Sequence, residues 1–190
     1  MSIYTISSET DVTTLATGDV FVVYDASASN IKKATVAELI TAMSLATTPL
    51  AGGVVDITAS VATITAASHA NRVVTLNVAT GTTVTLPAAT GTGNKYTFFV
   101  GTTFTASGVI EVANTTDVMA GNAYTVTTTA TNAEGFATSA TSDTVTLNGT
   151  TTGGILGDRV EIIDVASGVF SVVANTSSTG TEATPFSAAV

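Results

Sequence analysis

The sequence predicts a mainly β protein, with a small N-terminal strand–helix module followed by an antiparallel β-sandwich or jelly-roll-like domain. Threonine supplies 41 of the 190 residues, and β-branched side chains favour strands. Only 10% of the residues are charged while 45% are hydrophobic, whereas a disordered chain is charged and poor in apolar residues. From about residue 69 onward, short apolar runs alternate with turn residues at regular intervals.

The N-terminal module is expected over residues 1–48. The apolar run 20–24 predicts a strand, and the polar segment 25–30 predicts a turn. Thr35 and Glu38 have the spacing of a capping box, in which each side chain accepts a hydrogen bond from the other residue's backbone N–H, so a helix is predicted from this point. Four apolar residues then share one helical stripe: Val36, Leu39, Ile40 and Met43. A module of about 40 residues is too small for a self-sufficient core, so we expect it to dock on another surface.

Residues 49–68 are rich in Ala, Thr, Ser and Gly and predict a linker or extended arm, although several of their apolar residues can form strands. Residues 69–190 are expected to form the β domain. Eight runs in it predict strands: Val73–Val78, Thr83–Leu86, Tyr96–Val100, Val109–Ala113, Tyr124–Thr131, Thr144–Leu147, Arg159–Val165 and Val169–Ala174. From Thr176 on we expect a polar tail anchored by Phe186.

The composition excludes several kinds of site. The chain has no Cys, a single His and five basic residues, so it lacks the groups for a disulfide scaffold, a thiolate or histidine metal site, or a basic nucleic-acid face. His69 is expected at a surface or turn, because no Gly-x-Ser-x-Gly elbow accompanies it. Carboxylates such as Asp25, Asp117, Asp143 and Asp158 are scattered at turns and are expected to cap them. We therefore expect no enzyme activity, no cofactor and no metal.

Two glycine-rich segments are interpreted as loops. Gly91-Thr-Gly-Asn-Lys95 lacks the spacing of a phosphate-binding loop, and a strand follows it instead of a helix, so a turn is predicted. The segment from Gly149 to Gly154 has no Lys and predicts a flexible loop.

The low charge predicts a covered surface. A soluble monomer normally carries more charged residues, so we expect much of the exterior to be buried against other copies or a partner. The longest uncharged stretches are broken by Gly and Pro, which argues against a membrane span. The first residues lack the features of a secretory signal, and the absence of Cys suits assembly in a reducing cytoplasm.

Two stretches resemble virion proteins of tailed phages. Gly18-Asp-Val-Phe-Val-Val-Tyr-Asp-Ala-Ser27, followed by Ile31-Lys-Lys-Ala-Thr-Val-Ala-Glu-Leu39, resembles a short module of fibre and head-decoration proteins. Residues 72–98, with Gly157-Asp-Arg-Val-Glu-Ile-Ile-Asp164 and Gly168-Val-Phe-Ser-Val, are similar to β domains of such proteins, where Trp often stands at the position of Phe170. The resemblance implies a trimeric structural protein on a phage particle.

The expected function is therefore that of a capsid decoration protein, also described as a cement or head-fibre protein. As a homotrimer on the outer surface of the capsid, it would bind the major capsid protein and stabilise the shell, with neither nucleic acid nor a membrane as partner. The residues expected to dock on the capsid are Phe21, Val23, Tyr24, Lys32, Lys33, Leu39, Ile40 and Met43. For the charged residues Lys32 and Lys33, the alternative is an ordinary solvated surface. For the whole chain, the alternatives are a tail fibre or receptor-binding protein contacting host glycans, a capsule depolymerase, or a bacterial adhesin.

Overall fold

The computed structural model describes residues 18, 20–25, 30–38, 53–129 and 131–190. It divides the chain into two compact units, Met1–Leu50 and Ala51–Val190.

The described part of the first unit is a hairpin followed by a helical turn. Strands β1 (Val20–Asp25) and β2 (Asn30–Thr35) pair antiparallel, and residues 36–38 are helical. The strand at 20–24 and the helix start at Thr35 are confirmed. Strand β2 was not predicted, because its sequence NIKKAT has few β-branched residues and depends on pairing with β1.

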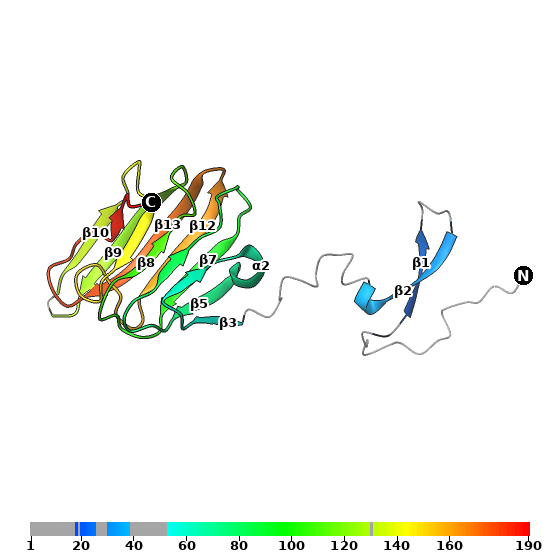
Figure 1. Cartoon of the computed structure of the whole chain (residues 1–190), viewed down its shortest axis with the longest axis horizontal. Helices are drawn as coiled ribbons and strands as arrows, with labels where there is room; N and C mark the ends of the chain where they lie inside the picture. The colour runs from blue at the N-terminus through cyan, green and yellow to red at the C-terminus, as the bar shows by residue number, and fades with distance from the viewer. Residues whose placement is uncertain (1–17, 19, 26–29, 39–52, 130) are drawn as a thin grey trace, which may run out of the picture. The chain divides into compact units, whose positions relative to one another are not determined.

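The second unit consists of two sheets packed together (Figure 1). The seven-stranded sheet contains, from edge to edge, β10 (Ala133–Ala137), β9 (Val118–Thr127), β13 (Val169–Ser178), β12 (Arg159–Ala166), β7 (Lys95–Val100), β5 (Arg72–Leu76) and β3 (Val54–Ile57). The five-stranded sheet contains β14 (Phe186–Ser187), β11 (Thr144–Leu147), β8 (Gly108–Glu111), β6 (Thr83–Thr85) and β4 (Val61–Thr63).

Strands β3 to β8 alternate between the two sheets. Each odd-numbered strand enters the seven-stranded sheet and each even-numbered strand enters the five-stranded sheet, so the chain makes three successive coils. The strands pair in parallel: β3 with β5 and β5 with β7 in one sheet, and β4 with β6 and β6 with β8 in the other. The crossover that a parallel pair requires is here a strand of the opposite sheet.

The expectation of a mainly β, sandwich-like fold is confirmed, but the expectation of antiparallel, jelly-roll-like pairing is wrong. Both sheets are mixed. In the seven-stranded sheet β12 pairs antiparallel with β7 and β13, while β9 pairs in parallel with β13. In the five-stranded sheet β11 pairs antiparallel with β8 and β14. Alternating apolar residues predict a strand and its buried face, but they carry no information on the direction of the neighbouring strand. The coiled path of the chain determines that direction.

The segment 53–68, expected to lie in a linker, contributes to both sheets. It carries β3, β4 and the start of the helix α2 (Ala66–His69). The side chains of Ile57 and Ile64 are buried in the core. These strands are only four and three residues long. Such short apolar runs are hard to recognise within an Ala- and Thr-rich segment, so the sequence suggested an extended arm.

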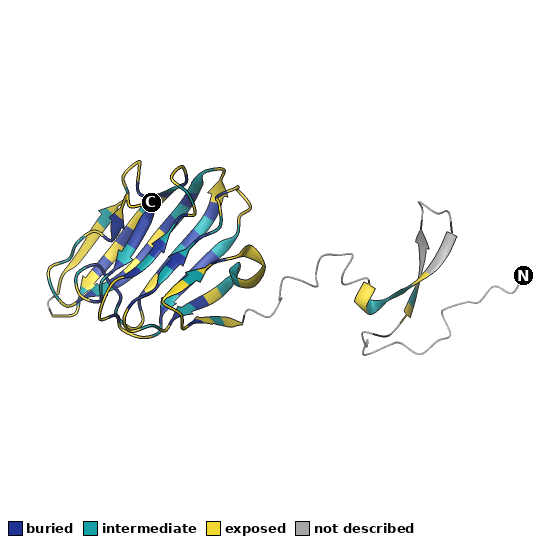
Figure 2. Ribbon diagram, viewed as in Figure 1, coloured by how far each residue is buried: buried dark blue, intermediate teal, exposed yellow. Residues whose placement is uncertain are grey.

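The core lies between the sheets, and buried and exposed residues alternate along the strands (Figure 2). Its largest fully buried side chains include Tyr96, Phe98 and Phe170. Two buried threonines, Thr125 and Thr176, lie opposite each other on β9 and β13, and their hydroxyl oxygens are 2.8 Å apart. Each hydroxyl thus has a partner, as a buried polar group requires.

The eight predicted strand runs in the β domain all correspond to strands, with shifts at their ends. Strand β9 begins earlier than predicted, and β13 continues to Ser178 into the expected tail. Phe186 is buried and pairs through β14 with β11, which confirms its anchoring role. Strand β10 was not predicted because its sequence AEGFA lacks β-branched residues.

Candidate functional site

The residues expected to dock on a capsid fall partly within the described hairpin. Phe21, Val23 and Tyr24 lie on β1, and Lys32 and Lys33 lie on β2. The register places Val23 opposite Lys32. The Phe21 side chain is partly buried and the Lys33 side chain is exposed. The other three expected docking residues, Leu39, Ile40 and Met43, lie outside the described residues.

The predicted capping box is present. The Thr35 N–H donates to Glu38 Oε2 at 2.7 Å, and the Glu38 N–H donates to Thr35 Oγ1 at 3.1 Å. The hydrogen bonds from the Thr35 backbone and side chain hold the pKa of Glu38 below its ordinary value. This pair fixes the point at which the chain leaves β2 and turns into the helix.

The glycine-rich loop before β7 surrounds a carboxylate of the protein itself. The backbone N–H groups of Thr90, Gly91 and Thr92 donate to the two oxygens of Asp164 at 3.0, 2.6 and 3.1 Å, and Thr92 Oγ1 donates at 2.6 Å. Gly91 has φ = 76°, and a Cβ there would lie 3.2 Å from the Ala166 Cα. The prediction of a turn is confirmed. The loop's N–H groups serve an internal anion, so they are not open to phosphate.

Three further aspartates are buried at turns, as the sequence predicted for each of them. Asp117 accepts from the Ala89 N–H at 2.8 Å, Asp143 from the Ala189 N–H at 2.8 Å, and Asp158 from the Gly154 and Ile155 N–H groups at 2.8 and 3.0 Å. The Asp25 side chain is not among the described ones. These carboxylates hold loops in place and are not directed toward a cavity.

The environment shifts the pKa values of these buried aspartates in different directions. At Asp143 and Asp164, burial acts to raise the pKa, but the hydrogen bonds from backbone N–H groups and threonine hydroxyls outweigh it and the pKa lies below its ordinary value. At Asp158 burial outweighs the hydrogen bonds from Ile155, Ser177 and Gly154, so the pKa is raised.

Two further expectations concern His69 and the loop 149–154. His69 is the partly exposed last residue of α2, and its Nδ1 accepts from the Thr65 N–H at 3.0 Å, which confirms a surface position. The loop is held by Asn148, whose Oδ1 accepts from the N–H groups of Thr150, Thr151 and Thr152. Within the described residues, no group of three or more His, Asp or Glu side chains is placed to hold a metal ion.

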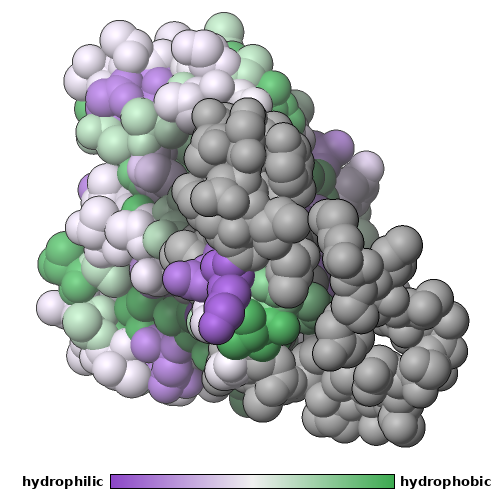
Figure 3. Space-filling view, turned by 90° about the vertical axis from the view of Figure 1, so that its right-hand side faces the viewer, coloured by the Kyte–Doolittle hydropathy of each residue, from purple (hydrophilic) through white to green (hydrophobic). Residues whose placement is uncertain are grey.

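One end of the β unit carries the outermost strands of both sheets. Strands β3 and β4 are the last members of their sheets there, and a connection of only three residues joins them. Val54 and Val61, on these two strands, are 65% and 67% exposed, the highest values among the large apolar side chains of the described residues. We call this end of the unit the open coil end. Figure 3 shows hydrophobic side chains beside weakly polar ones, with several strongly hydrophilic groups between them.

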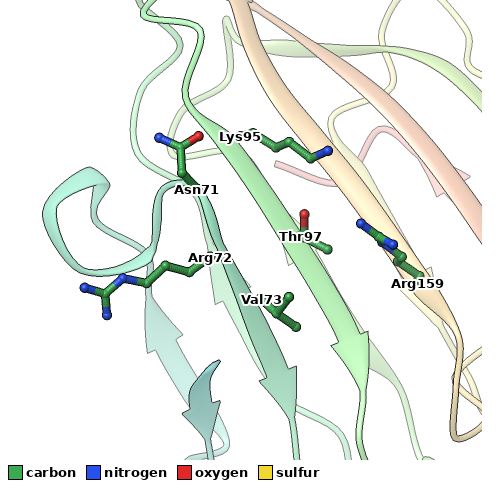
Figure 4. A pocket seen from close by; sticks show the side chains of 6 residues that line it. All are labelled: Asn71, Arg72, Val73, Lys95, Thr97 and Arg159. Carbon is green, nitrogen blue, oxygen red and sulfur yellow. The ribbon is translucent and has the colours of Figure 1, made fainter. Parts of the chain in front are cut away.

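The outer face of the seven-stranded sheet has two adjoining hollows. One, of about 330 Å³, is lined by Asn71, Arg72, Val73, Lys95, Thr97 and Arg159 (Figure 4). The other, of about 250 Å³, is lined by Arg159, Glu161, Val173 and Asn175. Arg159 belongs to both. Sequence reasoning missed these residues, because they lie on four strands that only the register brings together.

No protein-family model matches the chain, and no curated protein matches its sequence. Within the described part of the chain, no helix has the length and hydropathy needed to cross a bilayer.

Proposed function

We propose that the chain is a capsid decoration protein that binds the lattice of a major capsid protein as a homotrimer and stabilises the shell. The observation that carries this proposal is the open coil end of the β unit. Unpaired strand edges invite pairing with another chain, and natural monomers normally protect them with charges or Pro. Here the Asp56 carboxylate on β3 accepts hydrogen bonds from Thr75 and Asn77 of its own chain, and Val54 and Val61 are exposed on the two edge strands, so this end suits contact with sister chains.

The organisation of the chain also supports a binding role. The N-terminal hairpin forms a unit distinct from the β unit, which suits a docking module connected to a projecting body. The four buried aspartates are bound to loops of their own chain. Binding across capsomer boundaries would stabilise the assembled shell, because a ligand stabilises the state that it binds, and three connected modules would add avidity.

The experiment compares capsids assembled without the chain with capsids to which the purified chain is added. The chain should co-sediment with the particles and raise their melting temperature. A variant with Lys32→Glu and Lys33→Glu should lose most of this binding, whereas the control with Lys32→Arg and Lys33→Arg should retain it. Antibody labelling of whole particles should mark the head. Labelling of the tail, or an unchanged melting temperature with the wild-type chain, would contradict the proposal.

A further inference from the structure

All basic residues of the β unit lie around one hollow. Residues 53–190 contain nine acidic and three basic residues, and the three basic ones, Arg72, Lys95 and Arg159, all line the larger hollow on the outer face of the seven-stranded sheet. Figure 4 shows Lys95 and Arg159 on either side of Thr97, with Arg72 on the adjacent strand. In an acidic protein, this is a local concentration of positive charge.

One carboxylate offsets this charge in part. Glu161 Oε2 lies 2.6 Å from Lys95 Nζ and 3.5 Å from an Arg159 guanidinium nitrogen. The Arg72 guanidinium points away from these groups in Figure 4, so Lys95, Arg159 and this single anion leave a formal charge of +1 at the hollow. The hollow therefore retains positive charge and donor groups for an anionic ligand.

Uncharged polar groups and one aromatic ring extend the site across the sheet. Asn175 lines the second hollow and lies beside Arg159 in the register, and Tyr124 lies beside Asn175. Residues paired in this way present their side chains on the same face. Tyr124 is 56% exposed. We call the group formed by Lys95, Glu161, Arg159, Asn175 and Tyr124 the polar strip. Lys95 belongs to it through its ion pair with Glu161, since the β7 residue in register with Arg159 is Phe99. The strip crosses β7, β12, β13 and β9, or about 14 Å at the usual strand spacing.

We propose that the polar strip binds an acidic oligosaccharide through its sugar carboxylates. The guanidinium of Arg159 can bind a carboxylate with two parallel hydrogen bonds. The exposed Asn175 amide offers donors and an acceptor to sugar hydroxyls, and the exposed Tyr124 ring offers an apolar surface to a sugar ring. The hollows are shallow and lie on a sheet face, which suits an extended chain of small polar rings.

The same features disfavour an acidic peptide. A peptide bound by strand addition needs a free sheet edge, whereas β12 and β13 lie in the interior of the seven-stranded sheet. This proposal goes beyond the decoration role and does not depend on it, because none of the strip residues belongs to the hairpin unit.

The test is calorimetric titration of the full chain with a galacturonate tetramer at low and moderate salt. The wild-type chain should bind the tetramer, more weakly at higher salt, and should not bind the uncharged galactose tetramer. Arg159→Gln and Tyr124→Ala should each lower the affinity at least tenfold, whereas Tyr124→Phe should retain it. Glu161→Gln should raise the affinity, because it removes the competing carboxylate. Asn132→Asp, which makes the same charge change as Arg159→Gln at an exposed position outside the strip, should have no effect.

Thermal melting of each variant shows that it is folded, since all substituted side chains lie at the surface or are partly exposed. No heat of binding with the wild-type chain, or equal affinity in the Arg159→Gln variant, would overturn the proposal. Equal binding of a glutamate tetramer would overturn it as well, because the strip would then recognise charge alone. A failure here leaves the capsid experiments unaffected.

Discussion

Asp164 holds the loop before β7 with both of its oxygens. Replacing it with Asn turns one acceptor into an NH₂ group that faces the N–H groups of the loop. We expect Asp164→Asn to lower the free energy of unfolding by about 2–3 kcal/mol at neutral pH, because buried donors lose their acceptor. Urea unfolding at pH 7 measures this loss. A loss no larger than that of an exposed control, Glu134→Gln, would contradict it.

The two directions of pKa shift predict opposite effects of acid on the aspartates. The pKa of Asp164 is lowered in the folded state, so its stabilising effect is present above the ordinary carboxyl pKa and is lost as the pH falls through the lowered value. The cost of Asp164→Asn should therefore shrink on acidification, as measured by urea unfolding at a series of pH values down to about 3.

For Asp158 the sign is reversed. Burial raises its pKa, so its ionised form opposes folding at neutral pH, and this penalty disappears as the pH falls through the raised value. The cost of Asp158→Asn should therefore grow on acidification, because only the wild-type side chain gains a proton. Measuring Asp158→Asn and Asp164→Asn in the same pH series is the check. Parallel trends for the two variants would contradict the assigned directions.

At the scale of elements, Phe186 determines whether the short strand β14 stays in place. Two residues of β14 pair with β11, and Asp143 binds the N–H groups of Ala189 and Val190 that follow. We expect Phe186→Ala to cost about 3–4 kcal/mol, as large-to-small core substitutions do, and to expose the segment after Ser178 to protease. Phe186→Leu should restore most of the protection. Equal cleavage of the wild-type chain and the Ala variant would show that β14 is not anchored by this ring.

The sequence predicted the elements with strong local signals and missed those that depend on distant pairing. The runs around Val73, Tyr96 and Val169 alternate clearly and became strands, whereas β10 has little strand propensity and exists because β9 lies beside it. Parallel pairing in the coils follows from the path of the chain, which periodicity does not encode. The polar strip was not predictable for the same reason, because Lys95 and Arg159 are 64 residues apart and come to share the Glu161 carboxylate only through the pairing of β7 with β12.

For the whole molecule, the open coil end predicts how copies associate. We expect the wild-type chain to have three times its 18.9 kDa mass in light scattering. Lysine on an exposed edge strand prevents pairing, because its charge would have to be buried, so Val54→Lys with Val61→Lys should shift the mass toward the monomer. The control Leu156→Lys with Val165→Lys adds the same charge at other exposed apolar positions and should leave the trimer intact. A monomeric wild-type chain would contradict this assembly, because β3 and β4 would then be stable without a partner. A trimer that persists in the Val54 and Val61 variant would also contradict it, because the subunits would then associate through another surface.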